Sequence, residues 1–206
     1  MQTRGRHGLK TRGLCEPYGC ALNFCSNCGS SVVSKIPPGD HLARFVCESC
    51  GMIHYKNPLL VLGCVPQWGE EILLCRRAIE PRLGFWTVPA GFMENGETMQ
   101  HAAARECYEE ALARVEVGSL LAIVNVTHAG QVHVMFRARL LTREFAPGPE
   151  SLEVRLCREA DIPWDELAFP SGEFTLRKYF ADRAAGREDH HFTELTRSWA
   201  AKAVAK

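Results

Sequence analysis

The chain has 206 residues, 46% of them hydrophobic, and its 24 lysines and arginines balance its 24 aspartates and glutamates. This size fits one ordinary domain with a small appendage, and the composition allows a packed core. A formal net charge of zero argues against general binding to nucleic acid or to a membrane surface, because both favour a strong basic excess. No apolar run approaches the roughly 18 residues that a membrane-spanning helix needs.

Residues 1–22 are basic and without periodicity, so we expect them to be poorly ordered. They lack the apolar segment of a secretory signal, and we therefore expect a cytoplasmic location. Ten cysteines are many for a cytoplasmic chain. Three of them lie inside apolar runs and are predicted to be buried free thiols: Cys64, Cys75 and Cys157. The sequence gives no role to Cys15 and Cys20.

Four further cysteines have the spacing of a zinc site. They form two CxxC pairs separated by eighteen residues: Cys25, Cys28, Cys47 and Cys50. This spacing supplies four thiolates to a tetrahedral Zn²⁺, two from each tight turn. Gly29 and Gly51 end the two turns, where a positive φ is readily adopted only by glycine. We therefore predict a structural zinc ribbon over residues 23–56.

The alternative for the ribbon is a direct role in reading nucleic acid. The segment between the two CxxC pairs carries only Lys35 and Arg44 as cations, together with one acid. Such a segment does not make the basic surface that nucleic acid requires. The sequence therefore favours a ribbon whose zinc holds together a segment too small to fold alone.

From residue 57 to residue 185 the pattern predicts a mixed α/β domain. The strand-like runs LLVLGCV, EILLCRR and FWTVPAG precede a predicted helix at about 98–112. Two further strand-like runs and a loop rich in proline and glycine follow, and a second helix is expected at about 171–184. Strands around a central helix indicate a layered α/β fold. The polar residues 186–206 predict a loosely attached tail.

Three glutamates of the first predicted helix share one face. At 100° per residue, Glu106, Glu109 and Glu110 lie within an arc of about 100°. Like charges at these spacings repel, so cations should compensate them. Arg105 is one candidate, with Glu97 expected to hold it. Mg²⁺ or Mn²⁺ is the other, because these ions prefer carboxylate oxygens, bridge phosphates and activate water. An ordinary solvated acidic face is the alternative.

The segment around these glutamates resembles the Nudix box, G-x5-E-x7-R-E-U-x-E-E-x-G-U, where U is apolar. The resemblance implies a Nudix α/β/α sandwich around a mixed β-sheet, preceded by the zinc ribbon. It also implies that the three glutamates bind the catalytic Mg²⁺ or Mn²⁺, joined by the Gly91 carbonyl, and that Glu97 and Arg105 orient the site. Leu112 stands where the box has glycine. We therefore expect the helix to continue past this position or to end differently.

The ribbon joined to such a box resembles the zinc-containing Nudix branch that includes NADH pyrophosphatases. After the box, however, the chain reads LLAIVNVTHAGQ, where those enzymes carry an SQPWPFPQSLM-like signature. Four segments are instead similar to the plant chloroplast Nudix enzyme that acts on FAD, and to its bacterial relatives: NFCSNCGS (23–30), FWTVPAGFMENGE (85–97), FAPGPESLE (145–153) and DIPWDELAFPS (161–171).

This second resemblance implies metal-dependent hydrolysis of FAD to FMN and AMP. ADP-ribose or NADH pyrophosphatase activity is the alternative among enzymes. An alternative of another class is a non-catalytic nucleotide sensor that binds nucleic acid through the ribbon. The family resemblance is also compatible with a homodimer.

A further carboxylate is expected to assist the reaction, because a carboxylate held by a cation is a weak base. We predict this role for Glu153, whose place before Val-Arg-Leu resembles that of a glutamate before Ala-Arg-Trp in the zinc-containing Nudix enzymes. Glu150 is the alternative, a loop acid that reaches the substrate. Phe85 and Trp86 point to opposite sides of their strand, so at most one is expected to stack on a substrate ring.

Overall fold

The computed structural model describes residues 22–196 and divides the chain into two units, one ending at Asn57 and the other starting at Pro58. Cys15, Cys20 and nearly all of the segment expected to be poorly ordered lie outside the described residues. Among the residues that are described, no helix is long and apolar enough to cross a membrane.

The first unit is a small antiparallel sheet built next to the two CxxC turns. Its three strands are β1 (Val32–Lys35), β2 (Arg44–Cys47) and β3 (Ile53–His54). β2 is the central strand and pairs with both neighbours. Among the described residues of this unit, the buried hydrophobic side chains are Cys25, Val46 and Cys47. So small a core cannot hold a domain together without a further constraint.

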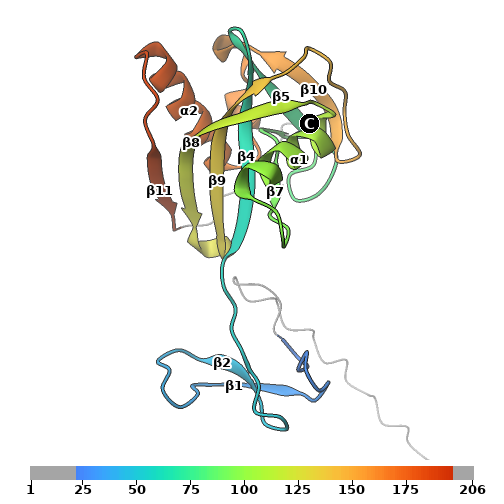
Figure 1. Ribbon diagram of the computed structural model, residues 1–206, viewed down its shortest axis with the longest axis vertical. Helices are drawn as coiled ribbons and strands as arrows, with labels where there is room; N and C mark the ends of the chain where they lie inside the picture. Colours follow the sequence, from blue (N-terminus) through green and yellow to red (C-terminus); the bar gives the residue numbers. More distant parts are fainter. Residues whose placement is uncertain (1–21, 197–206) are drawn as a thin grey trace, which may run out of the picture. The chain divides into compact units, whose positions relative to one another are not determined.

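The second unit is an eight-stranded sheet with helices on both faces (Figure 1). Its strands are β4 (Leu59–Trp68), β5 (Glu71–Arg77), β6 (Trp86–Thr87), β7 (Ala90–Phe92), β8 (Val115–Val126), β9 (Gln131–Leu140), β10 (Ser151–Cys157) and β11 (His191–Leu195). The helices are α1 (Met99–Ala111) and α2 (Pro170–Ala184), with 3₁₀ turns at Thr127–Ala129, Glu159–Asp161 and Trp164–Glu166.

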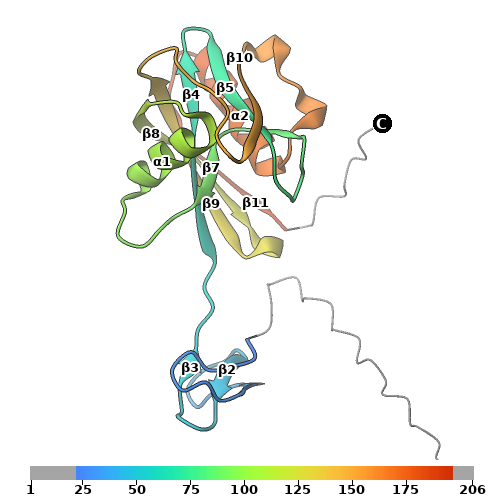
Figure 2. The ribbon, with the colours of Figure 1, turned by 90° about the vertical axis from the view of Figure 1, so that its right-hand side faces the viewer.

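The sheet is mixed. Its order is β10-β5-β4-β9-β8-β11, with β6 added beside β5 and β7 beside β4. The pairs β4–β9 and β8–β11 are parallel, and the other strand pairs are antiparallel. In Figure 2 the helices α1 and α2 lie on opposite sides of the sheet. This is the α/β/α sandwich with a mixed sheet that the sequence predicts.

Alternation along the strands divides the core between the two faces. On β4, Leu62 and Cys64 pack with α1, whereas Val65 packs with α2. The face that α1 buries consists of small side chains, with Ala103 and Cys107 fully buried, and this lets the helix approach the sheet closely. The three cysteines predicted to be buried free thiols are confirmed as such: Cys64, Cys75 and Cys157.

Helix α1 begins and ends with local backbone signals. The Thr98 side chain accepts a hydrogen bond from the His101 N–H at 3.2 Å and caps the N-terminus. At the other end Leu112 adopts the left-handed conformation, φ 48° and ψ 23°, and donates its N–H to the Tyr108 carbonyl. The expectation that leucine would extend or change this helix end is therefore wrong. The leucine takes the conformation that a glycine would, at a steric cost.

The C-terminal segment differs from the sequence prediction. Residues 191–195, expected to belong to a loosely attached tail, form β11 and pair in parallel with β8. The Leu195 carbonyl lies within hydrogen-bonding distance of Thr127 Oγ1 and His128 Nδ1, at 3.3 and 3.2 Å. Residues far away in the sequence hold this strand in place. The polar sequence of residues 191–195 alone therefore does not predict a strand.

Candidate active site

The four predicted zinc ligands lie together in the first unit. Their Sγ atoms are all within 4.8 Å of one another, with 3.7 Å between Cys25 and Cys50 and 3.5 Å between Cys28 and Cys47. Sulfur atoms bound to one Zn²⁺ at about 2.3 Å in a tetrahedron lie about 3.8 Å apart, so the cluster fits this ion. Gly29 and Gly51 have φ values of 75° and 74°, as the tight turns require.

Two of the three predicted metal-binding glutamates are buried beneath the short strand β7. Glu106 is 9% exposed and Glu110 is 7% exposed, whereas Glu109 is exposed. A side chain at Gly91 would lie 2.2 Å from the carboxylate of Glu106, so only glycine allows this carboxylate to lie against the strand. The backbone N–H of Ala90 donates a hydrogen bond to Glu110. The helix therefore holds two carboxylates against the strand that carries Gly91.

Burial disfavours the charged forms of these two carboxylates. Burial and the neighbouring Glu106 carboxylate raise the pKa of Glu110 to about 8. Burial also raises the pKa of Glu106. Oε2 of Glu110 is buried and has no hydrogen-bond partner among the described residues. An oxygen of this kind is costly to bury alone, and a bound divalent cation would satisfy it.

Arg105 holds the glutamates in their present arrangement. It donates hydrogen bonds to both oxygens of Glu97 and to one oxygen each of Glu106 and Glu109. Among the described residues, the four cysteines are the one group that brings three or more possible ligand atoms within 4.8 Å of one another. Binding of one divalent ion by all three glutamates therefore requires at least one of these side chains to move.

The structure separates the two candidate acids outside the box. The backbone of Glu150 accepts a hydrogen bond from Ala78, and its negative charge contributes to the raised pKa of both Glu106 and Glu110. Glu153 pairs with Arg76 at 3.9 Å, and its side chain is 48% exposed. Glu150 therefore lies within electrostatic reach of the candidate metal site, whereas the Glu153 side chain is directed to Arg76.

The loop that carries Glu150 is fixed to the end of α1. The N–H groups of Ala146 and Gly148 donate to the carbonyls of Ala111 and Glu110, at 2.9 and 3.0 Å. These carbonyls lack partners within the helix, so the loop caps it. A side chain at position 148 would lie 1.7 Å from the Glu109 carbonyl, so the contact depends on glycine. The FAPGPESLE segment thus positions an acid beside the glutamates of α1.

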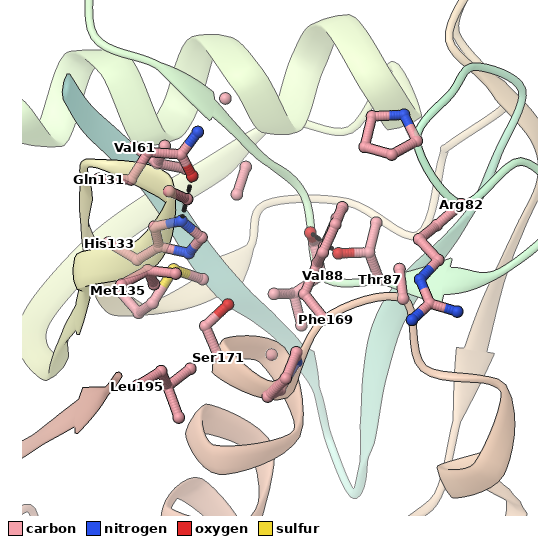
Figure 3. A pocket seen from close by; sticks show the side chains of 18 of the residues that line it. Val61, Arg82, Thr87, Val88, Gln131, His133, Met135, Phe169, Ser171 and Leu195 are labelled. Carbon is pink, nitrogen blue, oxygen red and sulfur yellow. Dashed lines mark hydrogen bonds between the residues drawn. The ribbon is translucent and has the colours of Figure 1, made fainter. Parts of the chain in front are cut away.

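A cavity of about 450 Å³ adjoins the same strand β7 (Figure 3). Gly91 lines it, so a single backbone segment separates the cavity from Glu106. Its walls are largely apolar and include Val61, Val88, Met135 and Phe169. A cavity of this size and polarity is typical of a site for part of a nucleotide-sized ligand.

The prediction that Phe85 or Trp86 stacks on a substrate ring is not supported. Both side chains are buried, at 8% and 4% exposure, and neither lines the cavity. The guanidinium of Arg155 covers the ring of Trp86 at 4.2 Å, and Arg82 lies over Phe85 at 5.1 Å. The core and these arginines therefore already occupy the faces of the two rings.

The residues that do line the cavity are not among those predicted from the sequence. His133 and Met135 come from β9, Phe169 and Ser171 from the start of α2, and Leu195 from β11. They lie far apart in the sequence, and no local pattern joins them. The one available signal is the alternation of β9, which places His133 and Met135 on the same side of the sheet.

Comparison with known families matches both units. A family model described as Nudix N-terminal, a zinc ribbon, matches residues 23–56, and the NUDIX domain model matches residues 58–181. The second match covers more than half of the chain. The protein therefore belongs to the Nudix family, with a zinc-ribbon segment in front of its Nudix domain.

The chain is also similar to individual proteins of this family. The crystal structure of a NUDIX hydrolase from Nitrosomonas europaea is 47% identical, with a TM-score of 0.81 over 84% of this chain and 100% of that one. An ADP-ribose pyrophosphatase from Streptococcus suis shares the fold, at 22% identity and a TM-score of 0.54 over 66% of this chain and 100% of that one.

Among curated proteins, the NAD-capped RNA hydrolase NudC of Stutzerimonas stutzeri is 28% identical over 132 residues. This similarity covers 63% of the present chain and 45% of the relative. The chain thus spans about half the length of the curated relatives it matches.

Proposed function

We propose that the protein is a metal-dependent hydrolase that cleaves the diphosphate linkage of a nucleotide-derived substrate. The observation that carries this proposal is the buried Oε2 of Glu110, which has no hydrogen-bond partner in the described part of the chain. This oxygen lies beside Glu106, behind the strand that lines the cavity. The zinc ribbon has a structural role in this proposal, since its four cysteines can fill the coordination of Zn²⁺.

The residues of the chain divide into ligands and positioning groups. Glu106, Glu109 and Glu110 would hold Mg²⁺ or Mn²⁺, joined by the Gly91 carbonyl. When bound, such an ion neutralises charge on the phosphates and makes a water more acidic. The Arg105–Glu97 pair positions the glutamates.

Glu150 is the better candidate for the additional carboxylate that acts as a base and accepts a proton from the attacking water. Its charge acts on Glu106 and Glu110, whereas Glu153 is paired with Arg76. This choice reverses the sequence-based preference for Glu153. The reason is the close backbone contact of Gly148 with the C-terminal end of α1, which brings Glu150 near the glutamates of that helix.

For the substrate, we place NAD(H)-type dinucleotides and ADP-ribose ahead of FAD. The curated relatives are named NAD-capped RNA hydrolases, and two phosphates joined to an adenosine are common to NAD(H), ADP-ribose and FAD. FAD stays the second candidate because of the four segments similar to the plant enzyme. A nucleotide sensor without activity is disfavoured, because every carboxylate of the box is present and two of them are buried at the site.

The test is a substrate panel with product analysis. Purified protein is incubated with ADP-ribose, NADH and FAD, each with Mg²⁺ or Mn²⁺, and the mononucleotide products are separated. We expect hydrolysis of at least one compound, with kcat/KM highest for ADP-ribose or NADH. In Glu110→Gln, kcat should fall at least about a hundredfold, which is the effect of removing one strong electrostatic stabiliser.

A preference for FAD of tenfold or more in kcat/KM would make the second candidate the substrate. No hydrolysis of any compound, or near-normal turnover in Glu110→Gln, would overturn the proposed chemistry.

A further inference from the structure

The cavity beside β7 has polar groups on two facing walls that the proposed chemistry does not use. One is the imidazole of His133 on β9, and the other is the hydroxyl of Ser171 in the first turn of α2. Figure 3 shows both facing the same space, with apolar side chains around them. Polar groups placed in an otherwise apolar cavity fix the orientation of a ligand.

The hydrogen bond that His133 makes defines what its ring presents to the cavity. Nε2 of His133 lies 3.0 Å from Oε1 of Gln131. A carbonyl oxygen only accepts, so the tautomer that makes this hydrogen bond is the one protonated on Nε2, in which Nδ1 is an acceptor. Burial lowers the pKa of His133 to about 4, and the ring is therefore uncharged near neutral pH.

The opposite wall presents donors. Ser171 is 5% exposed, and no described residue hydrogen-bonds its hydroxyl. The first turn of α2 has no side-chain cap, and Gly172 also lines the cavity. Pro170 has no N–H and the Glu173 N–H donates to the Phe169 carbonyl, so Ser171 and Gly172 offer the backbone donors of this uncapped turn.

We propose that this cavity binds the flat heteroaromatic ring of the nucleotide, and that His133 and the first turn of α2 recognise an edge of that ring on which an N–H donor and an acceptor are neighbours. This inference rests on the proposed function and names the part of the substrate that the cavity takes. Adenine, the nicotinamide carboxamide and the flavin ring each present such an edge.

The position of the cavity agrees with this role. Gly91 lies between it and Glu106, so a ring held here places its attached phosphates toward the glutamates of α1. Arg77 also lines the cavity, and its charge is close enough to Glu110 to lower the pKa of that carboxyl group. Its guanidinium lies over the ring of Phe169 at 5.1 Å. A cation at this point suits the passage of a phosphate chain from the cavity to the metal site.

The test measures binding rather than turnover. Dissociation constants of AMP, NMN and FMN are measured by calorimetry on the full chain, without added Mg²⁺ or Mn²⁺. We expect the wild type to bind at least one of the three with a Kd below about 1 mM. For that compound, His133→Leu should weaken binding about fivefold, and Ser171→Ala about threefold, the effect of losing one neutral hydrogen bond.

Two further variants separate recognition from packing. In His133→Asn the amide oxygen can replace Nδ1 as acceptor, so affinity should stay within about twofold of the wild type. His41→Leu, an exposed histidine of the zinc ribbon, is the matched control and should change nothing. Thermal unfolding is measured for each variant to check that the fold is retained.

The inference is overturned if none of the three compounds binds, if His133→Leu binds like the wild type, or if His133→Asn is as weak as His133→Leu. Its failure differs from failure of the proposed function. If the protein hydrolyses dinucleotides but binds mononucleotides equally well with and without His133, the proposed function stands and the proposed role of the cavity is wrong. If the protein binds mononucleotides through His133 but hydrolyses no dinucleotide, the role of the cavity stands and the proposed function is wrong.

Discussion

Arg105 and Glu97 form a bidentate ion pair in which Nε and Nη2 of the arginine lie 3.1 and 2.8 Å from the two carboxylate oxygens. The same guanidinium also donates to the Phe92 carbonyl at 3.0 Å. Since Glu97 precedes α1 and Phe92 ends β7, the pair fixes the helix against the strand that carries Gly91. An ion pair with this geometry orients groups more than it adds stability.

Replacing Glu97 by Gln should therefore lower activity through misplacement of the helix. Hydrogen bonds from Arg105 hold the pKa of Glu97 at about 2, so the carboxylate is charged at any working pH. Glu97→Gln keeps the shape but breaks the pair, and we expect kcat to fall about tenfold. Glu94→Gln is the matched control, since Glu94 contributes only its backbone N–H to this loop. Equal turnover in both variants would show that the pair has no positioning role.

The two acids after the proline–glycine loop should differ in effect. Glu150 acts on the buried glutamates, whereas Glu153 faces Arg76. We expect Glu150→Gln to lower kcat at least about tenfold with little change in KM, as when transition-state binding is lost. Glu153→Gln should stay within about threefold of the wild type. Parallel steady-state kinetics decide, and a larger loss in Glu153→Gln would restore the sequence-based assignment.

Leu112 should be replaceable by glycine with a gain in stability. Its φ of 48° is unfavourable for leucine, and its side chain is 43% exposed, so little packing is lost. Leu112→Gly should raise the free energy of unfolding of the second unit by about 0.5–1 kcal/mol. Leu112→Ala keeps the strain and should show no gain. Urea unfolding measures both, and a glycine variant less stable than the wild type contradicts the argument.

The four-cysteine cluster should carry metal in the purified protein. We expect about one zinc per chain by elemental analysis. Cys47→Ser should lower the zinc content and the stability of the first unit, while the second unit, a compact unit of its own, should keep part of its activity. Cys157→Ala, at a buried thiol of the second unit, is the control and should keep its zinc. Freshly purified wild type without zinc would refute the assignment.

His133 should make stability depend on pH. Burial lowers its pKa to about 4, against about 6.5 in the unfolded chain. Between these values the unfolded chain binds a proton that the folded chain does not. The contribution of His133 to stability is therefore complete above about pH 6.5 and is lost as the pH drops to about 4, by up to about 3 kcal/mol. Urea unfolding at pH 4.5 and 7.5 should show that the free energy of unfolding of the wild type falls relative to that of His133→Asn, because the buried glutamates titrate alike in the two proteins. An equal change in the two proteins would be evidence against it.

Local patterns are sufficient to predict the metal helix. Thr98 caps α1, small apolar residues give its buried face, and the glutamates follow at helical spacing, so each signal lies within one short segment. The CxxC turns are local in the same sense. Both features can be assigned from the amino-acid sequence, because the residues that act together are also neighbours in the chain.

Features that depend on distant contacts are not predictable in this way. β11 forms because β8 offers an edge and because Thr127 and His128 lie near its last carbonyl. Glu150 reaches the site because Gly148 permits a backbone contact with α1. In both cases the deciding partner lies far away in the sequence, where propensity and periodicity carry no information.

The parallel pairing of β11 with β8 also bears on the order in which the protein is assembled. The last described strand supplies Leu195 to the cavity, whereas the metal helix needs only residues that come much earlier in the chain. Local helices form before distant strands meet, because long loops are slow to close. A ribosome-bound or partly folded chain would thus have its glutamate helix in place before it has a closed cavity. The cavity wall that Leu195 forms is completed only when β11 pairs with β8.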